Sequence, residues 1–267
     1  PEPALETSFG NAGLIAPGHS YAWTTPKLPG NLFKSLFEKK RAFRFKFQWD
    51  PAMWYWGIQF LRQCTHKNME VNTLRKHRLS IYSQKCFHQL VDETNISYHK
   101  NKKGLIYFFR TQESYQEGSQ KLAMLNSVMK NLQLLNRKEL LQLEPALSRS
   151  QTRIYGGIYC STDESGSCRD FTLELVKICM DKGASFHYNT TVLNVEKAKN
   201  NIKKIYTDKG DFQADKYVLA CAAFSPLIAR MVGEYLPIYP VKGYSMTLPI
   251  LDQKKVPEHS GIDEDNL

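Results

Sequence analysis

The sequence has no hydrophobic run long enough to cross a membrane. Its longest apolar stretch, Met53–Leu61, is interrupted by Gly57 and Gln59. It falls far short of the roughly 20 residues that a spanning helix requires. Neither a charged leader nor an apolar segment follows Pro1, so no signal peptide is visible. These absences predict a chain without a transmembrane segment.

Several motifs of metal and nucleophile chemistry are also missing. The six cysteines are scattered without a CxxC pair, which argues against a zinc ribbon or a dense disulfide framework and favours a reducing compartment. The histidines show no HExxH spacing, and no nucleophile elbow or Ser-His-Asp pattern is present. We therefore predict no metal site and no catalytic acid–base pair. Asp163–Glu164 is interpreted as a structural turn, and His19 is the only histidine retained as a functional candidate.

Acidic residues are too few to balance the basic ones. The chain has 36 Lys and Arg against 26 Asp and Glu, a net charge of +10. Part of the excess lies in Lys34–Phe47, where basic residues are interleaved with aromatic ones. Such a segment is compatible with binding to nucleic acid or to anionic lipid. The alternation of Phe43, Phe45 and Phe47 with basic residues is equally typical of a strand with one wet face. We favour the strand and expect no nucleic-acid partner.

The first 150 residues predict a loop followed by a mostly helical region. Residues 1–30 are rich in Gly, Pro, Ser and Thr and predict a loop. Residues 105–109 are β-branched and aromatic and predict a strand. The spacing of apolar residues predicts a helix over residues 112–135, with Leu122, Leu125, Met129 and Leu132 on one stripe. A short helix then begins with Asn136 and Glu139 as a capping box and stops before Pro145.

Residues 151–235 alternate between helix and strand. Asp170 is expected to cap a helix that Gly183 ends. A strand at residues 185–188 and a three-stranded meander over residues 191–214 are predicted next. Residues 217–223 are apolar on both faces, as in a strand buried in a parallel sheet, and Ser225–Pro226 begins a helix. A buried strand that leads into a helix N-terminus is typical of a cofactor cradle. The order predicts a dinucleotide-binding α/β domain with an inserted substrate domain.

Two segments carry a resemblance to a known family. The first is Leu5–Gly18 (LETSFGNAGLIAPG), whose small residues let the backbone approach a planar ring. The second is Pro240–Ser245 (PVKGYS), expected to enter the sheet of the substrate domain. Residues 26–64, 104–110, 143–147, 156–157 and 163–168 lie between them in the family's order and spacing. The whole chain resembles the bacterial D-amino-acid dehydrogenases (small subunit), within the FAD-dependent oxidoreductases that include glycine oxidase and sarcosine oxidase.

The resemblance implies a fold, a cofactor and a reaction. The fold is mixed α/β (α+β): an FAD-binding domain, residues 1–30 and 151–235, with an inserted substrate domain, residues 31–150 and 236–267, in which helices accompany a mixed sheet. The cofactor is FAD. The reaction is the oxidative deamination of a small-molecule substrate, a D-amino acid, to a 2-oxo acid and ammonia by hydride transfer to the flavin.

Site residues follow from the same resemblance. Those implied at the pyrophosphate and the flavin are Thr7, Ser8, Asn11, Ala12, Gly13 and Leu14. Val192 is implied to meet the adenine through its backbone. A second cofactor-facing turn comprises Ala220, Cys221 and Ala222. Lys242 and Tyr244 are the expected catalytic residues, because the resemblance places their strand near the ring.

The chain departs from the family in ways that leave alternatives open. It contains no GxGxxG fingerprint, which the family has upstream of Pro1, and the family's carboxylate-binding arginine lies beyond Leu267. The resemblance therefore implies truncation at both ends. The family often has Gly in place of Ala222 and Trp in place of Phe224. One alternative is a non-catalytic relative without FAD that acts as an interaction module; another is a basic module that binds nucleic acid or a membrane surface.

The cellular setting is an expectation from the same family. The resemblance implies a cytoplasmic protein, or one held peripherally on the inner face of a membrane with a link to quinones. Quinone and oxygen both stay open as the electron acceptor. The sequence does not decide the oligomeric state.

Overall fold

The computed structural model describes residues 2–35, 48–125, 131–199 and 201–265. The alternating aromatic and basic segment at residues 43–47 lies outside these ranges. The α-helices are α1 (Leu28–Ser35), α2 (Pro51–Arg62), α3 (His66–Thr94), α4 (Gln112–Leu125), α5 (Arg137–Leu143), α6 (Cys168–Asp181) and α7 (Ser225–Met231). The 3₁₀ helices are η1 (Pro17–His19), η2 (Pro145–Arg149), η3 (Ala222–Phe224) and η4 (Gln253–Lys255). The strands are β1 (Leu14–Ile15), β2 (Leu105–Phe109), β3 (Leu132–Asn136), β4 (Gly156–Cys160), β5 (Glu164–Ser165), β6 (Val192–Ala198), β7 (Asn201–Thr207), β8 (Gly210–Phe212) and β9 (Ser260–Asp263).

The main sheet has four strands in the order β3-β4-β2-β9. Strand β4 pairs antiparallel with both β2 and β3, whereas β9 pairs parallel with β2. The parallel ladder aligns Leu105 with Ser260, so it joins parts of the chain that are far apart in the sequence. The mixed sheet and its helices confirm the predicted mixed α/β class.

Strand β2 is buried on both of its faces. Tyr107 and its neighbours at positions 105 and 109 pack with Leu122 of α4 in one apolar cluster. Ile106 packs with Leu140 of α5 in a second cluster. Because successive side chains of a strand point to opposite faces, α4 and α5 cover opposite faces of the sheet. The predicted strand at residues 105–109 is confirmed.

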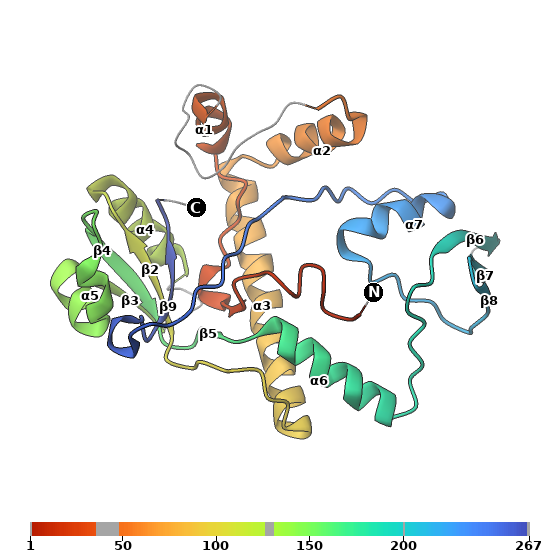
Figure 1. The fold of residues 1–267 in the computed structure, drawn as a ribbon. Coiled ribbons are helices and arrows are strands. Elements are labelled where there is room, and N and C mark those ends of the chain that lie inside the picture. The colour runs from red at the N-terminus through yellow and green to blue at the C-terminus, as the bar shows by residue number, and fades with distance from the viewer. Residues whose placement is uncertain (1, 36–47, 126–130, 200, 266–267) are drawn as a thin grey trace.

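Helix α3 runs through the centre of the molecule (Figure 1). The four-stranded sheet lies to one side of it, and the antiparallel meander β6-β7-β8 lies to the other. Near its C-terminal end, Val91 packs with Ile96 and Tyr98 and against Phe171 and Leu175 of α6. Helix α3 therefore connects the sheet side of the molecule with α6.

Local signals in the sequence located several elements correctly. Asn136 and Glu139 form the predicted capping box: the Glu139 amide donates to Asn136 Oδ1 over 3.1 Å, and the Asn136 amide donates to Glu139 Oε2 over 2.8 Å. Helix α6 ends just before Gly183, whose φ of +88° is the left-handed conformation that glycine tolerates. The cap of α6 was wrong, because Ser167 Oγ accepts from the Asp170 amide and Asp170 lies inside the first turn.

The helix predicted over residues 112–135 is too long. Helix α4 ends at Leu125, and Leu132 belongs to strand β3; Met129 lies outside the described residues. Leucines at positions 132 and 135 fit a helical period of three to four, but in β3 both are buried while Gln133 is exposed. Five residue pairs with β4 stabilise the strand, so tertiary pairing overrides the local helical pattern.

Two predicted strands are absent from the described structure. Residues 185–188 and 217–223 have no strand conformation, and Val218 is 90% exposed. An apolar segment becomes a buried strand only when neighbouring strands pair with its backbone. Within the described ranges no strand pairs with either segment. The predicted meander and the helix start at Ser225–Pro226 are confirmed.

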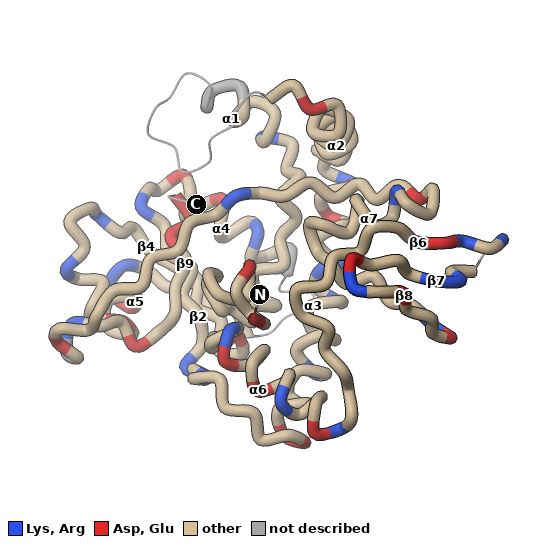
Figure 2. Tube along the Cα trace, turned by 45° about the vertical axis from the view of Figure 1, so that its right-hand side comes forward, with Lys and Arg blue, Asp and Glu red and all other residues tan. Residues whose placement is uncertain are grey.

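Among the described residues, no helix combines the length and the apolar character needed to cross a membrane. Acidic and basic residues are interspersed along the meander β6 to β8 (Figure 2). Lys203 pairs with Glu196 over 2.8 Å and Lys204 with Asp211 over 3.1 Å. These two lysines are therefore paired locally with acidic residues.

Candidate functional site

The loop at residues 7–14 is shaped by the side chain of Asn11. Asn11 Nδ2 donates to the carbonyl oxygens of Thr7 and Ser8 over 2.8 and 3.2 Å. Asn11 Oδ1 accepts from the amide of Gly13 over 2.7 Å. One side chain thus satisfies three backbone groups and closes the loop on itself.

The inner end of this loop lies against the turn at residues 163–166. The Gly166 amide donates to the carbonyl oxygen of Gly13 over 2.9 Å, and β1 pairs antiparallel with β5. Gly13 has a φ of +62°, and a Cβ added there would overlap the carbonyl oxygen of Gly166. Only glycine permits this approach of two backbones.

The outer side of the loop presents unpaired donors. Gly10, Asn11 and Ala12 are exposed, and their amides donate to no acceptor within the part of the chain that the structure describes. Exposed backbone N–H groups on small residues suit a cofactor whose ring edge and phosphates carry hydrogen-bond acceptors. The residues present therefore fit the FAD that the resemblance implies.

The expected catalytic segment lies beside the same loop. A Cβ added at Gly10 would lie 2.6 Å from Ser245 Oγ, so residue 245 contacts the loop. Lys242 Nζ lies 5.1 Å from the centroid of the Tyr244 ring, and Tyr244 is 88% exposed. The expectation that residues 240–245 enter a sheet was wrong: the segment has no strand conformation, because no described strand pairs with it.

The remaining candidate residues lie around the meander. Val192 begins β6 opposite Thr207, and β6 is connected to the end of α7 by a hydrogen bond from Lys197 Nζ to the Val232 carbonyl oxygen over 3.2 Å. Residues 220–222 precede α7 and are exposed. Ala222 has a φ of +44°, in the left-handed region that favours glycine. The position at which the family often has glycine therefore has a backbone conformation suited to glycine.

A buried acid that sequence reasoning did not select lies behind the loop. Asp163 is fully buried; its Oδ1 accepts from the Gly18 amide over 2.9 Å, and its Oδ2 accepts from the Tyr107 hydroxyl. Removal from water raises the pKa of Asp163, and these hydrogen bonds partly oppose that rise. Its partners are 145 and 56 residues away in the sequence, so no local pattern signals the contact.

His19, the histidine retained as a candidate, is engaged in packing. Its Nε2 lies 2.6 Å from Glu264 Oε1, and its ring stacks on Tyr107 with centroids 5.0 Å apart. Burial alone would raise the pKa of Glu264, but the hydrogen bond and the charge of His19 hold it below its ordinary value. His19 thus links the segment after the loop to the sheet and to the end of β9.

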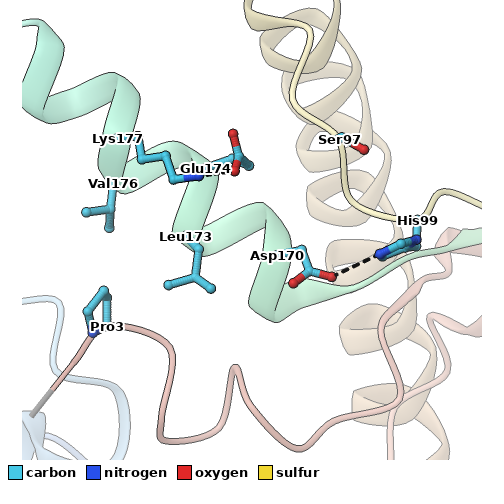
Figure 3. Close-up of a pocket in the computed structure, with 8 residues that line it drawn as sticks. All are labelled: Pro3, Ser97, His99, Asp170, Leu173, Glu174, Val176 and Lys177. Carbon is cyan, nitrogen blue, oxygen red and sulfur yellow. Dashed lines mark hydrogen bonds and ion pairs between the residues drawn. The ribbon is translucent and has the colours of Figure 1, made fainter.

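A separate open hollow of about 430 Å³ lies on α6. Figure 3 shows Leu173 and Val176 projecting from the same side of α6 toward Pro3. Its charged side chains lie close to one another in two pairs, His99 with Asp170 over 3.5 Å and Lys177 with Glu174 over 2.6 Å. The hollow offers apolar contact and no arrangement of reactive groups.

Comparisons with known proteins identify relatives of the chain. The model of the FAD dependent oxidoreductase family matches residues 1–266. D-amino acid dehydrogenase from Granulibacter bethesdensis is 36% identical over 262 residues, which cover 98% of this chain and 63% of that protein. D-amino acid dehydrogenase from Agrobacterium fabrum is 36% identical over 264 residues, which cover 99% of this chain and 63% of that protein. The chain spans about 63% of the length of these curated relatives.

Solved structures share the fold at lower identity. Glycine oxidase from Geobacillus kaustophilus aligns with a TM-score of 0.56 and 24% identity, over 61% of this chain and 44% of that one. L-proline dehydrogenase from P. horikoshii aligns with a TM-score of 0.51 and 19% identity, over 59% of this chain and 41% of that one. These likenesses concern the fold alone.

Replacing Ala222 by glycine is expected to stabilise the protein by up to about 1 kcal/mol. The left-handed conformation costs an alanine roughly 1–2 kcal/mol, and the greater freedom of glycine in the unfolded chain offsets part of the gain. Urea unfolding of Ala222→Gly measures the difference. Ala223→Gly is the matched control without a positive φ, and it should lose up to about 1 kcal/mol. A loss of stability in both variants would contradict the assignment of strain to Ala222.

Replacing Glu264 by glutamine is expected to remove a pH-dependent contribution to stability. The folded pKa of Glu264 lies below the unfolded value of about 4.3. Its ionised form therefore stabilises the fold above that pH, and the contribution is lost as the pH falls through the lowered pKa. The unfolding free energy of the unmodified protein, minus that of Glu264→Gln, should be positive at about pH 7 and shrink at about pH 3. Urea titrations at both pH values test this, and an unchanged difference would contradict it.

Proposed function

The chain belongs to the FAD-dependent oxidoreductase family, and from that premise we propose that it takes part in the oxidative deamination of D-amino acids to 2-oxo acids and ammonia. The relatives at 36% identity are D-amino acid dehydrogenases, which supports the D-configuration. The observation that carries the proposal is the exposed loop at residues 7–14, whose unpaired amides lie beside the segment of Lys242 and Tyr244.

The proposed cofactor contacts use backbone groups. Amides of the loop, Thr7 to Leu14, bind the pyrophosphate and the flavin; the supporting observation is the set of free donors at Gly10 to Ala12. The backbone of Val192 binds the adenine. The turn at residues 220–222, directly before α7, forms the second cofactor contact. Both turns consist mainly of small residues, which suits close approach of a backbone to a ligand.

FAD held by the loop at residues 7–14 and the turn at residues 220–222 would supply the redox chemistry, as the acceptor of a hydride from the substrate Cα. Hydrolysis of the resulting substrate imine would release the 2-oxo acid and ammonia. The protein orients the substrate and excludes water. The ammonium group of Lys242 is suited to bind the substrate carboxylate, and the ring of Tyr244 lies next to it. We include no general base, because a neutral substrate amine needs none.

The proposed domains divide the chain into a part that binds the cofactor and a part that binds the substrate. Residues 1–30 and 151–235 hold the cofactor, and residues 31–150 and 236–267 form the substrate side. Strand β4 lies between β2 and β3 in the four-stranded sheet, so the boundary at residue 151 leaves one strand of the cofactor group in the sheet of the substrate group. The contact of residue 245 with Gly10 is one of the places where the two groups meet.

We also propose a peripheral contact with a membrane surface, through which electrons reach a quinone. Helix α2 supports this second function, because Trp54, Tyr55, Ile58 and Leu61 are each 38–52% exposed along it. Exposed aromatic and aliphatic residues on one helix bind the boundary between headgroups and acyl chains, and a net charge of +10 favours anionic lipid. A cytoplasmic location on the inner face of the membrane is consistent with this contact.

The purified protein is expected to show two visible absorption bands between roughly 350 and 500 nm, either as isolated or after addition of FAD. Anaerobic addition of a D-amino acid should bleach them, because the hydride reduces the flavin, and the L-enantiomer should not. A colourless chain that does not bind added FAD would contradict the enzyme and support a non-catalytic relative.

Two glycine variants distinguish the effect of displacing the loop on FAD binding from the effect of backbone strain alone. Gly13→Ala and Gly183→Ala both place alanine at a positive φ, but only the first meets another backbone, that of Gly166. Gly13→Ala should weaken FAD binding by about tenfold or more. Gly183→Ala should leave the affinity for FAD unchanged. Equal affinities of the two variants would argue against cofactor binding by the loop.

The membrane contact predicts that the protein sediments with anionic vesicles more than with zwitterionic ones. The double variant Ile58→Ser with Leu61→Ser removes two exposed aliphatic side chains of α2 and should lower the sedimented fraction several-fold. The matched control, Leu79→Ser with Ile81→Ser, removes two from α3 and should sediment like the unmodified protein. Equal loss in both variants would contradict docking through α2.

A further inference from the structure

The segment from Gly13 to Gly18 connects the proposed flavin-contacting loop to the body of the protein. It is held at both of its ends by one short turn, residues 163–166. At the first end, the Gly166 amide donates to the Gly13 carbonyl oxygen over 2.9 Å, and Leu14 and Ile15 pair with Ser165 and Glu164. At the second end, Asp163 Oδ1 accepts from the Gly18 amide over 2.9 Å. Two fixed ends leave the segment little freedom to shift.

The contact at Gly18 is unusually close. A Cβ added at Gly18 would lie 2.5 Å from Asp163 Oδ2 and 2.8 Å from Cys160 Sγ. No side chain fits in that space, so the carboxylate reaches the backbone only because residue 18 is glycine. Asp163, Gly18 and Cys160 are all buried, so water does not replace the carboxylate as acceptor.

The other oxygen of Asp163 contacts the four-stranded sheet. Tyr107, in the middle of β2, donates its hydroxyl hydrogen to Oδ2, and Tyr107 is 2% exposed. A single carboxylate therefore connects the backbone at Gly18 to the buried strand β2. A hydrogen bond to a buried charged acceptor is worth more than one between neutral groups, and leaving its donor unpaired is costly.

We propose that Asp163 is a positioning residue, which holds the loop at residues 7–14 in register with the sheet so that its free amides face the cofactor. This inference rests on the proposed binding of FAD by that loop. Asp163 itself makes no contact with the cofactor in the proposed arrangement. It acts through the Gly18 amide, and the pairing of β1 with β5 transmits the constraint to Gly13.

Two substitutions of Asp163 are expected to give different results if the residue acts through its hydrogen bonds. Asp163→Asn keeps an oxygen that accepts from the Gly18 amide, and its Nδ2 can donate to the oxygen of the Tyr107 hydroxyl, so only the hydroxyl hydrogen loses its acceptor. Asp163→Ala leaves both donors buried and unpaired. Positioning through the hydrogen bond therefore predicts near-normal behaviour in the asparagine variant and loosening of the loop in the alanine variant.

Amide hydrogen exchange of the purified protein without FAD is the first measurement. Exchange within residues 13–18 should accelerate about tenfold or more in Asp163→Ala and stay within about threefold of the unmodified protein in Asp163→Asn. The affinity for FAD, measured by quenching of flavin fluorescence, should fall by about tenfold in the alanine variant and recover in the asparagine variant.

Glu144 provides a matched buried carboxylate elsewhere. It is 2% exposed and accepts from the amides of Glu258 and His259 over 2.8 and 2.9 Å. Glu144→Ala should accelerate exchange near residues 258–259 and leave residues 13–18 unchanged. Equal acceleration of residues 13–18 in Glu144→Ala and Asp163→Ala overturns the proposal, because the effect is then general destabilisation. Unchanged exchange there in Asp163→Ala also overturns it.

Different results contradict the proposed function and the positioning role of Asp163. An unmodified protein that binds no FAD contradicts the flavoenzyme, whereas the exchange data, which involve no FAD, still decide whether Asp163 positions the loop. Normal FAD affinity in Asp163→Ala, together with accelerated exchange, overturns the link between loop position and cofactor binding and leaves the flavoenzyme intact.

Discussion

The antiparallel pairing of residues 14–15 with residues 164–165 is the interaction on which the site depends. The ladder has only two residue pairs, but each of its strands is connected along the chain to a larger element of the fold. On one side the chain leads from the loop at residues 7–14 into η1, which packs on α3; on the other it leads from β4 into the N-terminus of α6. Because Gly13 and Gly166 approach without side chains, the pairing brings the loop against the turn directly, with backbone on backbone. The exposed amides of the loop are therefore placed by the rigid part of the fold.

Buried carboxylates serve as connections between elements in this protein. Asp163 joins a loop to the sheet, and Glu144 joins the end of α5 to the segment before β9. Glu164 pairs with His88 of α3. Each of these carboxylates accepts hydrogen bonds from groups that are distant in the sequence. These bonds replace the hydrogen bonds to water that burial removed. The pKa directions reflect the balance. Burial raises the pKa of Asp163 despite its hydrogen bonds. At Glu144 burial also acts to raise the pKa, but the hydrogen bonds of His259, Ala146 and Glu258 together hold it below its ordinary value. Asp163 accepts from one backbone amide and Glu144 from three, and the ionised form of Asp163 is the one that is harder to maintain.

The sequence predicts elements whose cause is local and fails where the cause is tertiary. The capping box at Asn136, the glycine after α6 and the turns of the meander are set by a few adjacent residues, and the structure has them. The sequence predicts a helix for residues 132–135, because their leucine spacing also fits the helical period, and only the pairing with β4 selects the strand. Residues 217–223 have the composition of a buried strand, but no described strand pairs with them. For the site, the small residues of the loop are visible in the sequence. The Asp163–Gly18 contact is not, because it spans 145 residues.

The two proposed cofactor turns illustrate how strongly a glycine is required. At Gly13 the positive φ and the adjacent carbonyl oxygen of Gly166 both exclude a side chain, so no other residue fits without displacing the turn at residues 163–166. At Ala222 the φ is also positive, yet a methyl group is accommodated, because the residue is exposed and no backbone packs over it in the described structure. Strain of this kind costs an alanine roughly 1–2 kcal/mol, which a folded protein tolerates at one position. Overlap with a backbone atom costs more, since a neighbouring element must move. The loop is therefore the part of the site where the fold allows least variation, and the turn before α7 is where this chain can depart from its family.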